Sequence, residues 1–171
     1  GGLQGEAGNI EGALADFMLA DSNLIALKPK SLNFSESAAL PLVTITAWEG
    51  LFDRAHVKKE DHVLIHGGTG GVGHIAIQLA KQHGARVATT VSSEEKAKIA
   101  RGLGAEDVIF YRDEKVEDYT QRLTKGKGFD AVFDTIGADN LDKSLEAAKV
   151  SGQVISIIGT NKHDLTPMHM K

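Results

Sequence analysis

The segment VLIHGGTGGVGHIAIQLAK, Val63–Lys81, places an apolar run, a glycine-rich turn and a helix-patterned stretch one after another. Five of the seven residues from Gly67 to Gly73 are glycine. The last six of them read G-x-G-x-x-G, directly after an expected strand and at the start of an expected helix. This context is typical of the turn that binds the phosphates of a dinucleotide. The lysine and hydroxyl residue of a phosphate-transfer loop are absent after the last glycine, so that alternative is disfavoured.

Each glycine of the turn has an expected role. We expect Gly68 to allow the tight turn, Gly70 to let a pyrophosphate approach the backbone, and Gly73 to let the helix pack closely on the strand. The start of the helix presents unpaired N–H groups and the positive end of the helix dipole, so an anion is stabilised there without a lysine. A glycine-rich turn that serves only the backbone is the alternative.

Composition restricts the class of protein. A chain of 171 residues is long enough for one compact domain and a small appendage. Its formal net charge is −4 with acidic and basic residues interspersed, which disfavours nucleic acid and anionic membranes as partners. There is no cysteine, which excludes disulfides and thiolate ligands and is compatible with a reducing compartment. No apolar run has membrane-spanning length and the opening residues lack a signal-peptide pattern, so a cytoplasmic location is expected.

Short apolar runs alternate with helix-patterned segments along the chain. The expected strands, rich in β-branched residues, are Val63–Ile65, Arg86–Thr90, Val108–Phe110, Ala131–Phe133 and Val154–Ile158. Between them, apolar residues recur with helical spacing. This alternation predicts an α/β fold, a doubly wound parallel sheet with helices on both faces.

The region before the first strand differs in pattern. Gly12–Leu27 is expected to be irregular, extended chain. Asn33 and Glu36 then form a candidate capping pair for a helix over Phe34–Ala55, in which Pro41 predicts a kink or a break. A domain boundary is therefore expected near residue 30.

The end of the second strand bears on the choice of dinucleotide. An NAD site usually has an acidic residue there that binds the ribose 2′-hydroxyl, whereas this chain has Ser92 and Ser93. Small hydroxyl residues leave room for a 2′-phosphate, which Lys96 would neutralise. Alternatively, Ser92 and Glu95 form an ordinary capping box and Lys96 is solvated. Glu94 and Glu95 would repel a phosphate, so NAD(H) stays the less favoured cofactor and NADP(H) the favoured one.

At family level, five segments carry a resemblance. In order they are SAALPLVTITAWEGLF, VLIHGGTGGVGHIAIQLAK, GLGAEDVIFYRDE, FDAVFDTIG and SGQVISIIG. Together they resemble the zinc-independent NADPH:quinone oxidoreductase (zeta-crystallin-like) branch of the medium-chain dehydrogenase/reductase superfamily. The resemblance implies that residues 31–171 form a Rossmann-type dinucleotide-binding domain without its last strand. Residues 1–30 would be a short extended remnant of a GroES-like catalytic domain, and the chain would be part of a longer protein.

The resemblance also implies roles for individual residues. Thr46 would lie near the nicotinamide, the backbone of Gly70–Val72 would hold the pyrophosphate, and Ser92, Lys96 and Tyr111 would surround the 2′-phosphate. Two of these have plain structural alternatives. The Thr46 hydroxyl would bond to its own helix backbone, and Tyr111 would only cover the edge of the sheet.

Loops at the carboxyl ends of the last two strands complete the candidate site. In a doubly wound sheet the ligand lies at these ends, so Asp134–Gly137 and Ile158–Gly159 are expected to border the nicotinamide. The full set of cofactor-binding candidates is Thr46, Gly68, Gly70, Gly71, Val72, Gly73, Ser92, Ser93, Lys96, Tyr111, Thr135, Ile136, Gly137, Ile158 and Gly159.

No sequence pattern indicates metal binding or hydrolysis. The seven histidines show neither H-E-x-x-H nor a ligand cluster, so no metal is expected, and His66 is interpreted as structural. A G-x-S-x-G elbow is missing, which leaves a hydrolase without a nucleophile. No catalytic residue is identified in the chain.

These observations lead to one favoured function and two alternatives. The favoured function is the NADP(H)-binding domain of an oxidoreductase that transfers hydride from NADPH to a small-molecule quinone or α,β-unsaturated carbonyl. The isolated chain is expected to be inactive, because the wall that clamps the substrate belongs to the absent domain. The alternatives are a non-catalytic NADP(H)-binding module, and a zinc-type alcohol dehydrogenase if the preceding sequence carries cysteine and histidine ligands.

The last expected strand predicts self-association. Gly152–Gly159 is apolar and lacks the lysine or proline that usually protects an exposed strand edge. It is therefore expected to form a homodimer contact by pairing with a second copy. Coverage of this edge by the tail His163–Lys171 is the alternative, which Pro167 disfavours.

Overall fold

The computed structural model describes residues 16–158. Contacts within the chain divide it into two units, Gly1–Leu42 and Val43–Lys171, and the division falls within a helix. In the described part of the first unit, the expected irregular chain up to Leu27 contains a 3-10 turn, η1 (Ser22–Leu24), in which the Asn23 N–H donates to the side chain of Asp21. The part of this expectation that concerns residues 12–15 lies outside the described residues.

The expected capping pair and helix break are both confirmed. Asn33 Oδ1 accepts from the Glu36 N–H over 2.8 Å, and Glu36 Oε2 accepts from the Asn33 N–H over 2.9 Å. This capping box begins α2 (Phe34–Ala39). A second helix, α3 (Pro41–Trp48), begins at the proline, whose fixed φ suits the first helical position. It continues as a π-helix, η2 (Glu49–Arg54).

A parallel sheet forms the second unit. Its strands are β1 (His62–His66), β2 (Arg86–Val91), β3 (Asp107–Phe110), β4 (Phe129–Asp134) and β5 (Ala148–Ser156), in the order β3-β2-β1-β4-β5. The first four contain the expected strands. The fifth differs from Val154–Ile158, because it begins at Ala148 and shifts register against β4 between Phe129 and Ala131.

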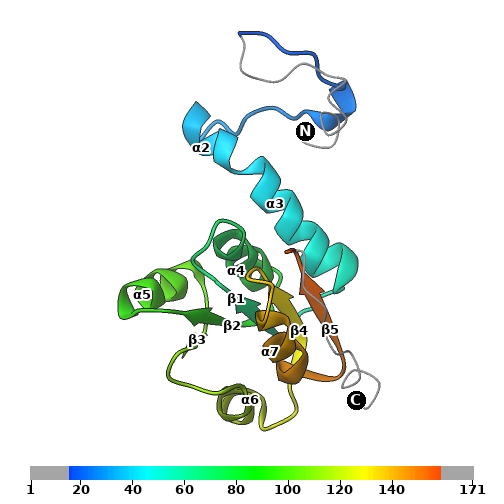
Figure 1. The fold of residues 1–171 in the computed structure, drawn as a ribbon. Helices are drawn as coiled ribbons and strands as arrows, with labels where there is room; N and C mark the ends of the chain where they lie inside the picture. Colours follow the sequence, from blue (N-terminus) through cyan, green and yellow to red (C-terminus); the bar gives the residue numbers. More distant parts are fainter. Residues whose placement is uncertain (1–15, 159–171) are drawn as a thin grey trace. The chain divides into compact units, whose positions relative to one another are not determined.

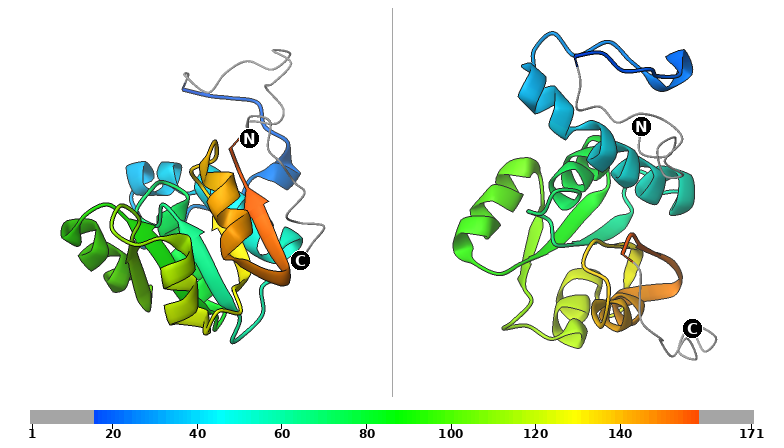
Figure 2. Two further views of the ribbon diagram at one scale, coloured as in Figure 1. Left: turned by 60° about the horizontal axis from the view of Figure 1, so that its bottom comes forward. Right: turned by 45° about the horizontal axis from the view of Figure 1, so that its top comes forward.

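Helices cover both faces of this sheet, as expected (Figures 1 and 2). They are α4 (Gly73–Gln82), α5 (Glu94–Leu103), α6 (Val116–Thr124) and α7 (Asn140–Ala147). α4 and α5 pack on one face with alternate strand residues such as Ile65, whereas α6 and α7 pack on the other with residues such as Leu64. Because the strand order reverses between β1 and β4, a crevice is expected at their carboxyl ends.

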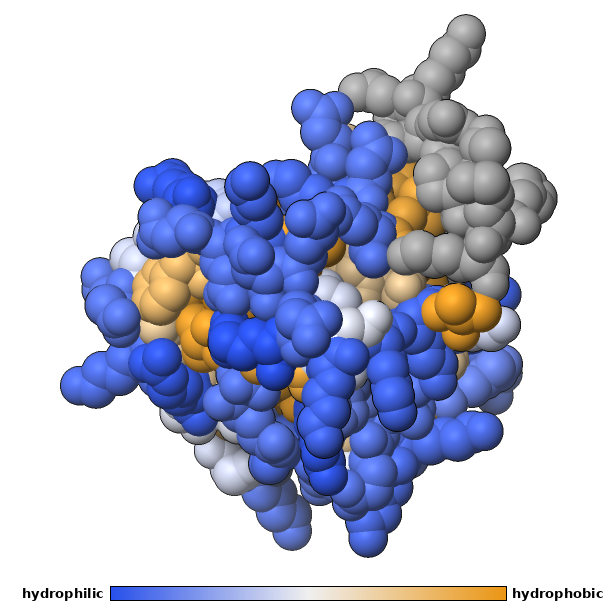
Figure 3. All heavy atoms as spheres, turned by 90° about the horizontal axis from the view of Figure 1, so that it is seen from below, coloured by the Kyte–Doolittle hydropathy of each residue, from blue (hydrophilic) through white to orange (hydrophobic). Residues whose placement is uncertain are grey.

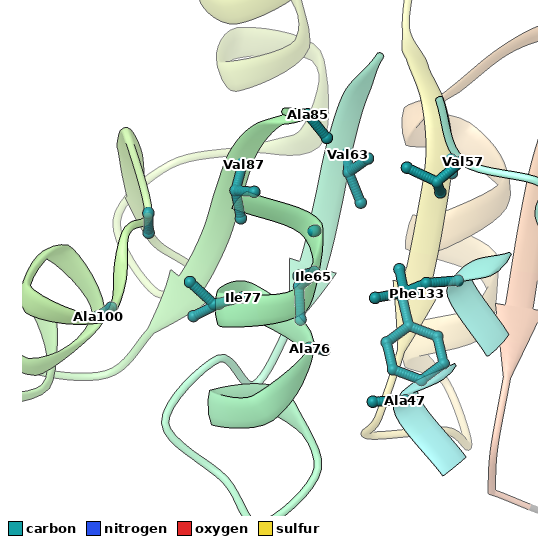
Figure 4. Packing of buried hydrophobic residues seen from close by; sticks show 14 of the residues in the cluster. Ala47, Val57, Val63, Ile65, Ala76, Ile77, Ala85, Val87, Ala100 and Phe133 are labelled. Atoms are coloured by element: carbon teal, nitrogen blue, oxygen red, sulfur yellow. The ribbon is translucent and has the colours of Figure 1, made fainter. Parts of the chain in front are cut away.

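The core on the α4 side is built from β-branched strand residues and small helix residues. Figure 4 shows Ile65 and Val87 of the sheet near Ile77 of α4, and Val63 further along β1, all of them buried. Burial of each such side chain contributes about 1.5–3 kcal/mol. Ala76 is fully buried and lets α4 approach the strands closely. The face of the molecule in Figure 3 is instead mostly hydrophilic, with smaller apolar areas between the polar side chains.

Candidate functional site

A cavity of about 930 Å³ opens at the carboxyl ends of β1 to β4, on the side of α6 and α7. Its walls are His66, Gly67, Thr90, Tyr111–Glu117, Tyr119, Ile136–Asn140, Lys143 and Glu146. Such a crevice beside the reversal in strand order is where open α/β sheets bind their ligands. The cavity therefore marks the candidate site.

The glycine turn lies between β1 and α4, beside this cavity. The Gly70 N–H donates to the Gly67 carbonyl over 2.8 Å, which closes the turn. The left-handed conformation in the turn falls on Gly67, at φ 72°. Gly68 is instead required by packing, because a Cβ there would lie 2.0 Å from Thr89 Oγ1.

The other two glycines of the motif differ in their surroundings. A Cβ on Gly73 would lie 2.2 Å from the Gly67 carbonyl oxygen, so the expected close packing of α4 is confirmed. Gly70 is exposed, and a Cβ on it would meet only that same oxygen, at 3.2 Å. The neighbouring Gly71 is also exposed. The turn is thus closely packed at Gly68 and Gly73 and exposed at Gly70 and Gly71.

The loop after β2 and the first turn of α5 carry three of the candidates for a 2′-phosphate contact, Ser92, Ser93 and Lys96. Ser93 is the N-cap of α5, and its side chain accepts from the Lys96 N–H over 3.4 Å. The alternative cap, Ser92 with Glu95, does not form because the helix begins one residue later. Ser92 is half-buried and the Lys96 side chain is exposed.

The loop after β3 is tied to the loop after β2. The Tyr111 N–H donates to the Val91 carbonyl over 3.4 Å. Tyr111 is 46% exposed and lines the cavity, with the Arg112 guanidinium carbon 5.6 Å from its ring centroid. Arg112 is a cation beside Tyr111 that was not predicted from the sequence, although its position next to Tyr111 was the signal for it.

Asp134 shapes the loop after β4. Its Oδ1 accepts from the N–H groups of Ile136 and Gly137, over 2.8 and 3.1 Å, and from Asn140 Nδ2 over 3.0 Å. Thr135 Oγ1 donates to the His66 carbonyl over 2.7 Å and so fixes this loop to β1. These bonds hold Ile136, 54% exposed, at the wall of the cavity.

Not all predicted residues meet at the cavity. Tyr111, Ile136 and Gly137 line it, whereas Thr46, Ile158, the loop after β2 and the outer part of the glycine turn do not. Thr46 is half-buried on α3, one turn after Val43, whose Cγ1 lies 3.8 Å from the position of a Cβ on Gly71. α3 therefore borders the glycine turn. Ile158 is 45% exposed, and Gly159 lies outside the described residues.

A buried histidine forms part of the cavity wall. His66 is 3% exposed, and its Nδ1 lies 3.3 Å from Thr90 Oγ1, which also accepts from the Gly67 N–H over 3.1 Å. His66 Nε2 and the buried Asp134 Oδ2 have no hydrogen-bond partner. Burial lowers the pKa of His66 from 6.5 to about 4; Asp134 opposes this shift and Lys143 adds to it. His66 is therefore neutral at pH 7.

The pKa of His66 predicts a pH dependence of stability. Unfolding returns the pKa to its ordinary value of 6.5, so the unfolded chain takes up a proton that the folded chain does not. The stabilisation that the neutral His66 side chain provides is complete above pH 6.5 and is lost as the pH falls toward about 4. The free energy of unfolding, measured in urea, is expected to fall by about 2 kcal/mol more in wild type than in His66→Gln between about pH 7 and pH 5. Parallel pH profiles for the two proteins would contradict this assignment.

A family model described as zinc-binding dehydrogenase matches residues 71–171, from the glycine turn through the rest of the chain. The chain belongs to the zinc-binding dehydrogenase family. Among relatives of this family, a 2-methylene-furan-3-one reductase of Solanum lycopersicum is 39% identical over 149 residues. That match covers 86% of this chain and 36% of the relative.

Solved structures agree with this assignment. An alcohol dehydrogenase superfamily protein from Novosphingobium aromaticivorans is 46% identical with a TM-score of 0.80, over 85% of this chain and 43% of that one. The Escherichia coli quinone oxidoreductase complexed with NADPH is 31% identical with a TM-score of 0.77, over 85% of this chain and 46% of that one. The expected resemblance to quinone oxidoreductases is confirmed. The chain spans less than half the length of each of these proteins.

The family description raises the question of a zinc site. Within residues 16–158, no three histidine, aspartate or glutamate side chains gather where they would hold a metal ion, so these residues do not fit a zinc ion. The expectation of a metal-free chain stays a prediction. Over the same residues, no helix is both long and apolar enough to cross a lipid bilayer.

Proposed function

We propose that this chain is the NADP(H)-binding domain of an oxidoreductase that reduces a small-molecule quinone or α,β-unsaturated carbonyl. The observation that carries this proposal is the glycine turn, with open backbone at Gly70, beside a cavity at the point where the strand order reverses. Two relatives, the 2-methylene-furan-3-one reductase and the quinone oxidoreductase complexed with NADPH, support it.

The proposed position of the cofactor follows from the arrangement of the loops. The pyrophosphate would lie on the backbone of Gly70–Val72, at the N-terminal end of α4, where N–H groups and the helix dipole favour an anion. The 2′-phosphate would reach Ser92, Ser93 and Lys96, and the adenosine would enter the cavity. Thr46 would lie on the side of the glycine turn opposite the cavity.

The nicotinamide end would extend along the ends of β4 and β5. Thr135, Gly137 and Ile158 stand there, and a Cβ on Gly137 would lie 2.5 Å from Ile158 Cβ. These residues would orient the ring, and the bound cofactor supplies the hydride. Gly159 belongs to the same proposed set.

Activity of the whole protein is part of the proposal. We propose that residues 31–171 bind the cofactor, that residues 1–30 belong to a catalytic domain, and that turnover needs parts of the relatives that this chain does not span. The absence of cysteine is compatible with the proposed cytoplasmic location.

The test of the proposed cofactor is a charge removal on α5. Lys96→Ala is expected to weaken NADPH binding about ten- to a hundredfold, because a charge-assisted hydrogen bond contributes about 1.5–3 kcal/mol. NADH lacks the 2′-phosphate, so its affinity is expected to change little. Titration calorimetry measures both, with Lys98→Ala, exposed on the same helix, as the matched control. Equal losses for the two cofactors in Lys96→Ala would rule out the NADP(H) assignment.

We also propose that the chain self-associates through β5, which stands at one edge of the sheet. Val150 and Gln153 on this strand are exposed. The double variant Val150→Lys, Gln153→Lys is expected to sediment as a monomer where wild type sediments as a dimer, because charge on an edge strand opposes pairing. A wild-type chain that sediments only as a monomer would contradict this proposal.

A further inference from the structure

The peptide group that joins β1 to the glycine turn is held from both sides by threonine hydroxyls. This group consists of the His66 carbonyl and the Gly67 N–H, which point in opposite directions because the peptide is trans. The Gly67 N–H donates to Thr90 Oγ1 over 3.1 Å, and Thr135 Oγ1 donates to the His66 carbonyl over 2.7 Å. Thr90 belongs to β2 and Thr135 directly follows β4, the two strands that flank β1. One peptide group is thus bonded to both neighbouring strands.

These two threonines continue the sheet beyond the last backbone pairs of β1. The pairs end with Ile65 opposite Thr89 in β2 and with His66 opposite Asp134 in β4. Each of the two threonines is the residue that follows the end of such a pairing. Polar backbone groups away from water need hydrogen-bond partners, and here hydroxyls supply them where β1 ends and the turn begins.

The conformation of Gly67 depends on this peptide group. Gly67 has a φ of 72°, and glycine takes positive and negative φ about equally readily, so the residue type does not fix the sign. Rotation of the peptide group between His66 and Gly67 would change this φ and would break both threonine bonds. The two hydroxyls therefore hold Gly67 in its left-handed conformation.

The rest of the glycine turn depends in turn on Gly67. Its carbonyl oxygen accepts from the Gly70 N–H over 2.8 Å. The same oxygen would lie 2.2 Å from a Cβ on Gly73, at the start of α4. A different φ at Gly67 would move this oxygen and break the bond from Gly70. The direction of the backbone N–H groups from Gly70 onward is therefore linked to the two hydroxyls.

We propose that Thr90 and Thr135 are positioning residues for the pyrophosphate, which act through the peptide group between His66 and Gly67 and keep the glycine turn in its anion-binding conformation. This inference rests on the proposed binding of NADP(H). It gives Thr135 a role through the turn, in addition to its proposed place beside the nicotinamide. Loss of one hydroxyl leaves a backbone group without its partner, so the binding conformation becomes less populated and the apparent affinity falls by the same factor.

The test removes the Thr135 hydroxyl without changing the shape of the side chain, in Thr135→Val. Thr90 is less suitable, because its oxygen also lies 3.3 Å from His66 Nδ1. NMR titrations compare two probes. Adenosine 2′-phosphate 5′-diphosphate carries the pyrophosphate but no nicotinamide, and adenosine 2′-phosphate carries neither. Thr135→Val is expected to weaken binding of the first probe about tenfold and to leave binding of the second unchanged. Thr135→Ser keeps the hydroxyl and should bind both probes as wild type does.

A second readout needs no ligand. Amide hydrogen exchange at Gly67 and Gly70 is expected to be about tenfold faster in Thr135→Val than in wild type, although neither N–H is bonded to Thr135. Thr120→Val is the matched control. The Thr120 hydroxyl is buried on α6 and has no hydrogen-bond partner within the described residues, so its removal should change neither the exchange rates nor the affinities.

The possible outcomes separate this inference from the proposed function. If wild type binds neither NADPH nor the diphosphate probe, the proposed function fails and this inference fails with it. If wild type binds both, only the role of the threonines is overturned when Thr135→Val keeps the wild-type affinity or exchange rates, or weakens the two probes alike. Should Thr135→Val not fold, wild type decides. Exchange at Gly67 and Gly70 that is as fast as in an unstructured chain would refute the inference, and slow exchange supports it.

Discussion

Gly70→Val is expected to leave the chain folded and to weaken NADPH binding at least about a hundredfold, which corresponds to about 2.7 kcal/mol. Gly70 is exposed, and a Cβ on it meets only the Gly67 carbonyl oxygen, at 3.2 Å, so the fold has room for a modest adjustment. The branched side chain would stand where the proposed pyrophosphate approaches the backbone. Calorimetry with NADPH measures the loss, and circular dichroism establishes that the variant is folded.

A matched glycine provides the control for this variant. Gly102, exposed on α5, has no atom within 4 Å of the position of a Cβ. Gly102→Val introduces the same side chain away from the glycine turn and is expected to bind NADPH as wild type does. If Gly70→Val also binds as wild type, the turn has only a structural role and the proposed cofactor site is wrong.

Among substitutions of the turn glycines by alanine, Gly73→Ala is expected to cause the largest loss of stability. Its Cβ would lie 2.2 Å from the Gly67 carbonyl oxygen and 2.9 Å from Gly68 Cα, both backbone atoms that cannot rotate away. Forcing such a contact costs about 3 kcal/mol, the upper end of ordinary overpacking. For a chain of this size the midpoint of thermal unfolding should fall by about 6–12 °C.

Scanning calorimetry of Gly73→Ala against wild type measures this shift. Gly102→Ala, in open space on an exposed helix, is the control and should stabilise slightly because alanine favours helix over glycine. An unchanged midpoint in Gly73→Ala would mean that α4 does not pack against the turn as closely as described.

Much of the fold is predictable from local patterns. β-Branched runs separated by helix-patterned segments predict the parallel sheet, because each strand must be covered on both faces. The break at Pro41 and the capping box of Asn33 with Glu36 follow from chemistry within a few residues. The fifth strand departs from its expected bounds because Ala148 already pairs with Phe129 of β4, and regular pairing resumes only at Gln153 after a register shift that no apolar run marks.

The candidate site is harder to predict from the sequence, because the register between paired strands decides which of its residues lie side by side. His66 and Asp134 are far apart in the chain, and only the pairing of β1 with β4 brings them side by side. Their lack of partners depends on bonds made by Thr90 and by the loop after β4. The backbone conformation within the turn also escapes local patterns, because the left-handed residue is Gly67, just before the motif, and none of the motif's own glycines.

The central claim is that NADP(H) binds along the carboxyl ends of the strands, with its pyrophosphate on the glycine turn. The most direct test is a nitrogen–proton NMR titration of the chain with NADPH. The account predicts large shifts for the backbone amides of Gly70–Gly73, of Ser92–Lys96 and of Tyr111, while amides at the opposite ends of the strands, such as that of Arg86, stay in place. Saturating NADPH that leaves the amides of the glycine turn unmoved would contradict it.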